Sequence, residues 1–342
     1  MTASLHDLRK PLAVQPAAAA AKLLVLPKDK VKADALNFYK FGHGNGETTH
    51  WPALDPFWKW LKKEITICTG YPNHGKSRFV HHLMLIKAAR KQWRFLLYVA
   101  ENEDDFYVDM AQMLVGRTAN YAAGHDRMTM DELTQALDWI LEHFVVVTAP
   151  EGATPKALID EFVRLDKTDR AAGGKGFDGI LIDPWNQLSH EFATREDLYL
   201  SEQLSMLRRV AKERDWSVWV TAHPAGNVKD KNGKLACPDA YSISGGKMWN
   251  NKADNVLAVY RPAFPDPMTE LLVHKIKKQG RVGKPGTLTL TYNVPQSRYY
   301  PEVGDDSHPL DSVSFNAPGV PRKLTDLPPS SFDTAAQEMP WN

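Results

Sequence analysis

One short stretch of the sequence has residue types and a spacing that indicate phosphate chemistry. In residues 69–79, Gly70 is followed by four residues and then by Gly75, Lys76 and Ser77, which is the Walker A pattern. In this pattern backbone N–H groups and the lysine hold the phosphates of a nucleotide, and the hydroxyl binds Mg²⁺. The predicted ATP-binding loop comprises Gly70, Tyr71, Pro72, Asn73, His74, Gly75, Lys76 and Ser77. Its histidine stands at a variable position and is assigned no chemistry.

Three polar residues that end apolar runs could complete a hydrolytic site. Asp183 ends "GILID" and fits a Walker B acid at the metal, or else an acidic cap on the next turn. Glu101 ends "FLLYVAE" and is expected beside the strand of the Walker A loop, placed to polarise water; the alternative is an exposed acid at a strand end. His223 follows "SVWVTA" and could touch the γ-phosphate, or be structural. Hydrolysis needs an oriented water and a neutralised charge, and these residues would supply both.

The elements that must position these residues follow from the pattern after Ile65. Short β-branched or aromatic runs alternate with segments of helical period, which predicts an α/β fold with a mostly parallel sheet flanked by helices. Strands are expected at 64–70, 94–102, 144–150, 179–185, 217–224, 255–262, 270–278 and 287–293. Helices are expected from Ser77, from Glu103, and over 130–144, 154–169 and 196–214. No long helices separate the last strands, so the C-terminal edge of the sheet is expected to be mixed or antiparallel.

Composition and charge limit the classes of function that this chain could have. No apolar run approaches the roughly 18 residues of a membrane span, so no membrane partner is expected and the chain is predicted to be cytoplasmic, or in the host cytoplasm if phage-encoded. Cys68 and Cys237 make neither a disulfide framework nor a metal-ligand cluster. The net charge of +1 does not by itself indicate nucleic-acid binding, although an acidic excess from Glu302 to the end leaves the rest of the chain more basic.

Composition also divides the chain into three parts. Residues 1–45 are expected to form an N-terminal arm that could link subunits, with one short helix. Residues 46–300 contain the α/β domain. Residues 301–342 are acidic and proline-rich, which predicts a largely disordered tail that could contact replication partners.

The ordered motifs together resemble the RecA-like motor of the replicative hexameric helicases of the DnaB and Twinkle type. The resemblance covers about residues 46–293 and is carried by "THWPALDPFWKW", "TGYPNHGKSRF", "AEN", "ILIDPWNQL", "VTAHP", "YSISGGKMWNNKADNVLAVYRP" and "HKIKKQGRVGKPGTLTLTYN". It implies a RecA-like P-loop NTPase core with ATP and Mg²⁺ as cofactors, in a helicase domain without primase. It also implies single-stranded DNA as partner and a homo-oligomer, a hexameric ring.

Further roles come from this resemblance alone. It implies that Lys76 and Ser77 form the P-loop pair, Glu101 is the catalytic base, Asp183 the metal-site acid and His223 the γ-phosphate sensor. Arg261 and Tyr292 fall where the family clamps the nucleotide base. Lys275, Lys277 and Arg281 fall where relatives reach into a neighbouring subunit's site. Lysine stands at 277 instead of the usual arginine finger, and it cannot make arginine's forked contact; the alternative for this cluster is a solvated strand and turn.

The family's DNA-binding loops match two stretches of this sequence. The first, "AGNVKDKNGKLACPD", carries Lys229, Lys231 and Lys234, and the second, "SGGKMWNN", carries Gly245, Gly246 and Lys247. Glycine lets backbone N–H groups approach phosphates, and lysine adds sequence-independent attraction. The first stretch has a flexible solvated loop as its alternative interpretation.

These observations predict an ATP-dependent ring-forming DNA helicase that translocates on single strands and unwinds duplex DNA during replication. The alternative is a RecA-like DNA-binding ATPase that acts as a loader or scaffold without processive unwinding. A small-molecule P-loop kinase is a third interpretation, which leaves His223 and the lysine loops unexplained.

Overall fold

The computed structural model describes residues 25–42, 44–101, 103–121, 126–190, 195–302 and 308–311. The chain divides into two compact units, Met1–Gly44 and Asn45–Asn342. In the first unit, helix α1 spans Lys28–Phe41 and none of its residues is buried. None of the helices in these ranges is long and apolar enough to cross a membrane.

The second unit is organised around one nine-stranded sheet. Its strands are β1 (Ile65–Thr69), β2 (Phe95–Val99), β3 (Phe144–Val146), β4 (Gly179–Asp183), β5 (Ser217–Ala222), β6 (Asn255–Tyr260), β7 (Met268–Ile276), β8 (Gly286–Asn293) and β9 (Arg298–Pro301). The strand order is β3-β2-β4-β5-β1-β6-β7-β8-β9. The first six strands in this order run parallel and the last three add on antiparallel. The predicted fold, a mostly parallel sheet with a mixed C-terminal edge, is therefore confirmed.

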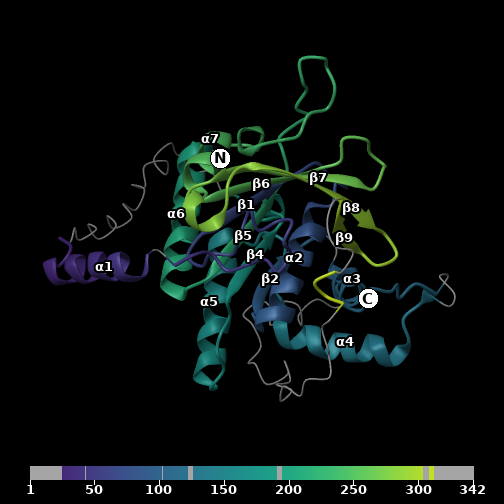
Figure 1. The fold of residues 1–342 in the computed structure, drawn as a ribbon, viewed down its shortest axis with the longest axis horizontal. Helices are drawn as coiled ribbons and strands as arrows, with labels where there is room; N and C mark the ends of the chain where they lie inside the picture. The colour runs from purple at the N-terminus through teal and green to yellow at the C-terminus, as the bar shows by residue number, and fades with distance from the viewer. Residues whose placement is uncertain are drawn as a thin grey trace, which may run out of the picture. The chain divides into compact units, whose positions relative to one another are not determined.

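Helices cover both faces of the sheet, and for this reason all the parallel strands except the edge strand β3 are buried along their whole length. The helices of this unit are α2 (Lys76–Lys91), α3 (Glu103–Val115), α4 (Met130–His143), α5 (Pro155–Ala171), α6 (Glu196–Arg214), α7 (Gly246–Lys252) and α8 (Gln279–Val282), with short 3₁₀ turns at Trp185–Gln187 and Ala240–Ser242. Figure 1 shows α2, α3 and α4 on one side of the sheet and α5 and α6 on the other.

Alternate strand residues feed two separate apolar cores. In β2, Phe95 and Leu97 point to the core under α2, α3 and α4, whereas Leu96 and Tyr98 point to the core under α5 and α6. The segment that precedes β1 packs on the first of these cores. Its Trp58 and Trp60 meet Trp219 of β5 with ring centroids 5.0 and 5.6 Å apart. Such aromatic pairs add roughly 0.5–1.5 kcal/mol beyond the buried area, so this segment is part of the folded domain.

The strand order corrects one expectation about the site. Glu101 was expected beside the Walker A strand, but β4 and β5 lie between β1 and β2. Sequence-adjacent strands need not pair, because each parallel neighbour is reached by a long crossover connection. Glu101 still reaches the site, because the carboxyl ends of all these strands meet at one edge of the sheet.

Further features differ from the sequence prediction, among them the short helix α8, which was not expected. Strand β9 and helix α7 were not expected, because each is short and lacks a strong periodic signal. Residues 308–311, here called the C-terminal strap, lie inside the predicted disordered tail but pack against the domain: His308, Pro309 and Leu310 are buried. His308 Nε2 lies 2.8 Å from His82 Nε2 on α2, and Arg90 donates to the carbonyl oxygen of Pro309. The rest of the predicted tail after Glu302 lies outside the described residues.

Candidate active site and nucleic-acid interface

The Walker A loop joins β1 to α2, and its conformation requires glycine. Gly75 precedes α2 with a φ of 90°, in the left-handed region. A Cβ atom at this position would lie 2.3 Å from the hydroxyl of Tyr299. That hydroxyl donates a 3.0 Å hydrogen bond to the carbonyl oxygen of Gly75. The loop leads directly into the first turn of α2, whose N–H groups lack intrahelical partners and therefore suit an anion.

A cavity of about 420 Å³ opens above this loop. Its lining includes most of the residues that the sequence assigned to nucleotide binding and hydrolysis: Pro72, Asn73, His74, Gly75, Lys76, Ser77, Glu101, His223, Arg261 and Tyr292. Arg78, Thr269 and Tyr299 also line it and were not assigned. Residues that are far apart in the sequence thus meet around one space.

Lys76 lies at the centre of the polar side of the cavity. Burial lowers the pKa of its ammonium group, while the carboxylates of Asp183 and Glu101 oppose that shift. Its Nζ lies 3.3 Å from His223 Nε2, and the same ring nitrogen lies 3.2 Å from Glu101 Oε1. In one tautomer Nε2 accepts from the ammonium, and in the other it donates to the carboxylate. His223 therefore connects the cation to the acid that the sequence assigned as base.

Asp183 sits behind Ser77 in a dense polar network. Its Oδ1 accepts from Ser77 Oγ at 3.0 Å and from the hydroxyl of Thr221, and its Oδ2 lies 3.3 Å from Nε2 of His81. Burial pushes the pKa of this carboxyl upward, but His81, Thr221 and Lys76 outweigh it, so the pKa stays below its ordinary value. A hydroxyl and an ionised carboxylate side by side are the oxygen ligands that Mg²⁺ prefers. This pair would hold such an ion between protein and phosphate.

Among the described residues, no group of three or more histidine, cysteine or acidic side chains could hold a metal ion. Cys68 and Cys237 are both free. The fit to Mg²⁺ therefore rests on Ser77 and Asp183 together with the oxygens of a bound phosphate.

The opposite end of the cavity is aromatic. His74 is buried and stacks on Phe264, with ring centroids 5.6 Å apart and planes 4° apart, and on Tyr260 at 5.7 Å. Its Nδ1 accepts the backbone N–H of Arg261 at 3.0 Å. Burial, with the nearby cations Arg261 and Lys76, lowers the pKa of His74, so the ring is a neutral packing group. The loop histidine thus builds the wall that carries Arg261.

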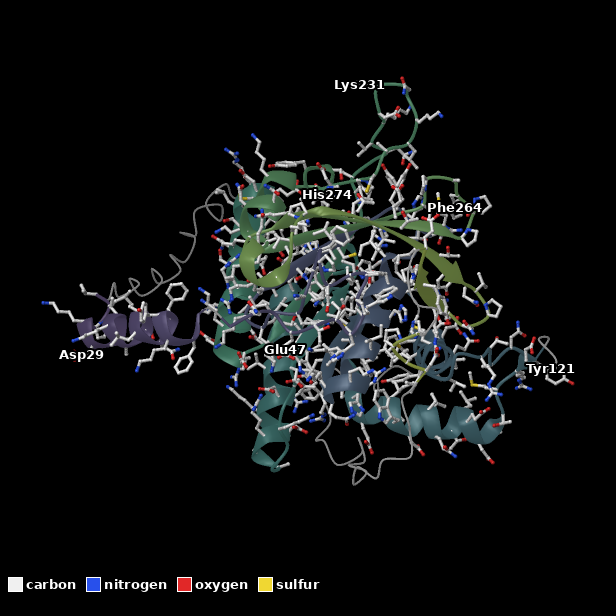
Figure 2. All side chains as sticks on the ribbon, viewed as in Figure 1. Asp29, Glu47, Tyr121, Lys231, Phe264 and His274 are labelled. Atoms are coloured by element: carbon white, nitrogen blue, oxygen red, sulfur yellow. The ribbon has the colours of Figure 1, made fainter. Side chains whose placement is uncertain are left out.

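Arg261 is fixed at the rim of this aromatic wall. Its guanidinium donates to the carbonyl oxygen of Asp266 and lies over the ring of Phe264, 4.8 Å from the centroid. Phe264 is 53% exposed, and Figure 2 shows it on the connection between β6 and β7. Arg261 and Tyr292 both line the cavity, and their planar groups can hold an aromatic base.

The lysines and arginine predicted to act on a neighbouring subunit lie away from this cavity. Lys275 donates to the carbonyl oxygens of Asn250 and Ala253, and Lys277 Nζ lies 3.3 Å from Asp254 Oδ1. Arg281 lines a different cavity, of about 290 Å³. Within one chain these residues cannot complete the site that contains Lys76, so any catalytic role would have to be in trans.

The predicted DNA-binding lysines lie on one loop and in the first turn of helix α7. Residues 225–239 form an extended hairpin, here called the lysine hairpin, in which Lys229, Lys231 and Lys234 are all exposed. Figure 2 shows Lys231 at its tip, projecting away from the sheet. Ala225 N–H donates to the carbonyl oxygen of Ser242, which ties the hairpin to the segment that leads into α7. Lys247, expected on a loop, is instead the second residue of this helix, and it is exposed.

Backbone conformation and packing explain the two glycines at the start of α7, Gly245 as its N-cap and Gly246 as its first residue. Gly245 has a φ of 74°, and a Cβ on Gly246 would lie 2.4 Å from the carbonyl oxygen of Tyr241. Both positions therefore need glycine whether or not DNA binds there.

Sequence reasoning missed several residues that shape the site. His81 follows Ser77 by four residues, so the helical repeat places it on the same face of α2 and could have identified it. Thr221, Phe264 and Tyr299 had no comparable local signal, because their contacts join segments far apart in the chain.

Comparison with known proteins gives relatives in sequence and in structure. No family model matches the chain. It is 28% identical over 257 residues to the Twinkle homolog protein, chloroplastic/mitochondrial, of Arabidopsis thaliana. The match covers 71% of this chain and 35% of that relative, so the chain spans about a third of the relative's length.

Two solved structures share the fold. One is an ATPase domain, which aligns with a TM-score of 0.62 and 14% identity, covering 79% of this chain and 97% of that chain. The other is a DnaB-like replicative helicase, solved to study its interactions with primase, which aligns with a TM-score of 0.60 and 15% identity, covering 79% of this chain and 66% of that chain. The resemblance expected from the motifs is therefore confirmed in sequence and in fold.

Proposed function

We propose that this chain, similar in sequence and fold to helicases of the Twinkle and DnaB type, is an ATP-dependent DNA helicase that translocates on single-stranded DNA. One observation carries the proposal: Lys76, Ser77, Glu101 and His223 line one cavity, with the exposed lysine hairpin on the same domain. A motor that moves along DNA needs a site that binds and hydrolyses a nucleotide and a surface that binds DNA. The cavity and the lysine hairpin are our candidates for these two parts.

ATP is the proposed substrate of the cavity. Lys76 and the N–H groups at the start of α2 would hold the phosphates, and Arg261 and Tyr292 the base. Ser77 and Asp183 would hold Mg²⁺, which supplies charge neutralisation at the phosphates when bound. Glu101 would accept the proton of the attacking water, and His223, which contacts both Lys76 and Glu101, would register whether the γ-phosphate is present.

Single-stranded DNA is the proposed partner of the lysine hairpin and of Lys247. Exposed lysines give sequence-independent, salt-sensitive binding to phosphates. Replacing Lys229, Lys231 and Lys234 with alanine should reduce the slope of log affinity against log salt by roughly 0.7 for each lost contact. An unchanged slope would mean that DNA binds elsewhere.

A homo-oligomeric ring, hexameric by analogy, is proposed as the active form. Lys275 and either Lys277 or Arg281 would complete the neighbouring subunit's site, because they lie away from the cavity of their own chain. Residues 1–45 are proposed as an arm that links subunits, residues 46–300 as the motor domain, and the acidic residues 301–342, apart from the C-terminal strap, as a contact for replication partners. The cytoplasmic location predicted from the sequence also stays a proposal, since the Twinkle homolog is named as chloroplastic/mitochondrial.

A DNA-binding ATPase that loads or supports other proteins without processive unwinding is the second candidate. The ion pair between Lys277 and Asp254 favours it, because a lysine held within its own chain is a poor substitute for an arginine finger. Unwinding of a forked duplex by the full chain with ATP separates the two. Strand separation supports the helicase, and DNA-stimulated hydrolysis without separation supports the loader. Hydrolysis that is insensitive to DNA would contradict both.

A further inference from the structure

Hydrogen bonds join the two sides of the lysine hairpin, so we expect the two sides to move together. Ala236 N–H donates to the carbonyl oxygen of Val228, and Asp230 N–H to that of Lys234, at 2.9 and 2.8 Å. The carboxylate of Asp230 also accepts the N–H groups of Asn232 and Lys234, both at 2.8 Å. A displacement at the base of this hairpin is therefore carried to the lysines at its tip.

The base of the lysine hairpin rests on two tyrosine hydroxyls. Tyr71 Oη accepts the N–H of Val228 at 2.9 Å and donates to the carbonyl oxygen of Ala236 at 2.9 Å, so it bridges both sides of the hairpin. The hydroxyl of Tyr260 donates to the carbonyl oxygen of Leu235. Together the two hydroxyls join the hairpin backbone to the rest of the domain.

Both tyrosines belong to the nucleotide side of the molecule. Tyr71 is the second residue of the Walker A loop, and Tyr260 directly precedes Arg261. The ring of Tyr71 is 5% exposed and is held edge-on against His74 and Tyr260, with centroids 5.3 and 6.4 Å apart. Its hydroxyl therefore cannot shift unless the Walker A loop shifts with it. Burial raises the pKa of Tyr71, so the hydroxyl keeps its proton.

We propose that Tyr71 couples the nucleotide to the DNA-binding surface by transmitting movements of the Walker A loop to the lysine hairpin, with Tyr260 as a second link. The coupling rests on the proposed function, because it assigns a nucleotide to the loop and DNA to the hairpin. Since coupling is reciprocal, nucleotide state should change DNA affinity through this contact, and DNA should change nucleotide affinity by the same factor.

The test compares the affinity of the full chain for a fluorescent oligo-dT with ADP and with a non-hydrolysable ATP analogue. In the wild type the two Kd values should differ by about 10-fold, within the usual range of allosteric coupling. Tyr71→Phe keeps the ring and removes both hydrogen bonds, so the ratio should fall to within about 3-fold of unity. Tyr260→Phe removes one bond and should have a smaller effect. Tyr300→Phe is the matched control, because the Tyr300 hydroxyl donates to the side chain of Gln296 and not to the lysine hairpin. This variant should keep the wild-type ratio of the two Kd values.

Two outcomes of this binding experiment would overturn the coupling role. If Tyr71→Phe weakens DNA binding equally in both nucleotide states, the hydroxyl only supports the hairpin. If the wild-type ratio is already one, nothing is transmitted.

Hydrogen exchange of the amides of Val228 and Ala236 gives a readout that needs no DNA. Exchange should respond to the ATP analogue in the wild type and not in Tyr71→Phe. A chain that fails to bind oligo-dT but shows this pattern would refute the helicase proposal and retain the coupling; the absence of any response would refute the coupling itself.

Discussion

Gly75 of the Walker A loop lies so close to Tyr299 that the effect of a substitution on the free energy of unfolding can be worked out. In Gly75→Ala, the new Cβ would lie 2.3 Å from the Tyr299 hydroxyl, and the residue would keep a φ of 90°. The left-handed backbone costs an alanine roughly 1–2 kcal/mol, and overpacking at the hydroxyl adds about 1–3 kcal/mol. The variant should therefore lose about 2–5 kcal/mol of unfolding free energy.

Tyr299→Phe separates these two contributions. With the hydroxyl gone, the nearest remaining ring atom lies 3.6 Å from the position that the Cβ would take, which is an ordinary contact. Alone, Tyr299→Phe should cost about 1 kcal/mol, since the Gly75 carbonyl keeps its bond from Phe79 N–H. The double variant should thus be about 1–3 kcal/mol more stable than the sum of the single effects predicts. Urea unfolding measures all four proteins, and additive effects would refute the assigned contact.

Five other variants test the site and the surrounding fold. Lys76→Ala should abolish ATP hydrolysis in a phosphate-release assay, because it removes the cation that contacts the β- and γ-phosphates; wild-type turnover would refute the assignment of the nucleotide site. Glu101→Gln should retain ATP binding, measured by calorimetry, but lose hydrolysis, and unchanged hydrolysis would leave Glu101 a strand-end acid. Lys277→Ala should slow hydrolysis on the order of 10³-fold with little change in nucleotide affinity, and if Arg281→Ala does so instead, Arg281 is the finger. Burial lowers the pKa of His143 to about 4, below the value of about 6.5 in an unfolded chain, so the unfolded state takes up this proton first. Stability is then complete above about pH 6.5, and about 3 kcal/mol is lost by about pH 4. His143→Gln should flatten the decline of the urea midpoint in that range, and an unaltered decline would exclude His143 as its cause.

The polar residues at the strand ends could be predicted from the sequence, because the apolar run that marks each strand directly precedes them in the chain. Each apolar run that stops at a polar residue predicts a buried parallel strand, and parallel strands place their carboxyl ends at one edge of the sheet. Lys76, Glu101 and His223 accordingly lie at this edge, and in the observed strand order they line one cavity. The order itself depends on long crossovers, and for this reason the expected position of Glu101 beside the Walker A strand was wrong.

The supporting contacts could not be predicted in the same way. Tyr71 reaches Ala236 and Tyr299 reaches Gly75 across most of the domain, and no periodicity relates such partners. The C-terminal strap was missed for a different reason: the acidic, proline-rich average of residues 301–342 hid two apolar positions, Pro309 and Leu310. Composition describes a segment as a whole, whereas burial is decided residue by residue.

Arg298 sets a limit on how far this protein can be shortened from its C-terminal side. Its guanidinium is 3% exposed; it donates to the carbonyl oxygens of Met113 and Leu114 at the end of α3 and to the carboxylate of Asp311. A version that stopped at Glu302 would leave this buried cation without its counterion and would uncover the apolar hollow that Leu310 fills. A boundary drawn where the acidic stretch begins would thus remove part of the core, and one drawn after Asp311 would preserve it.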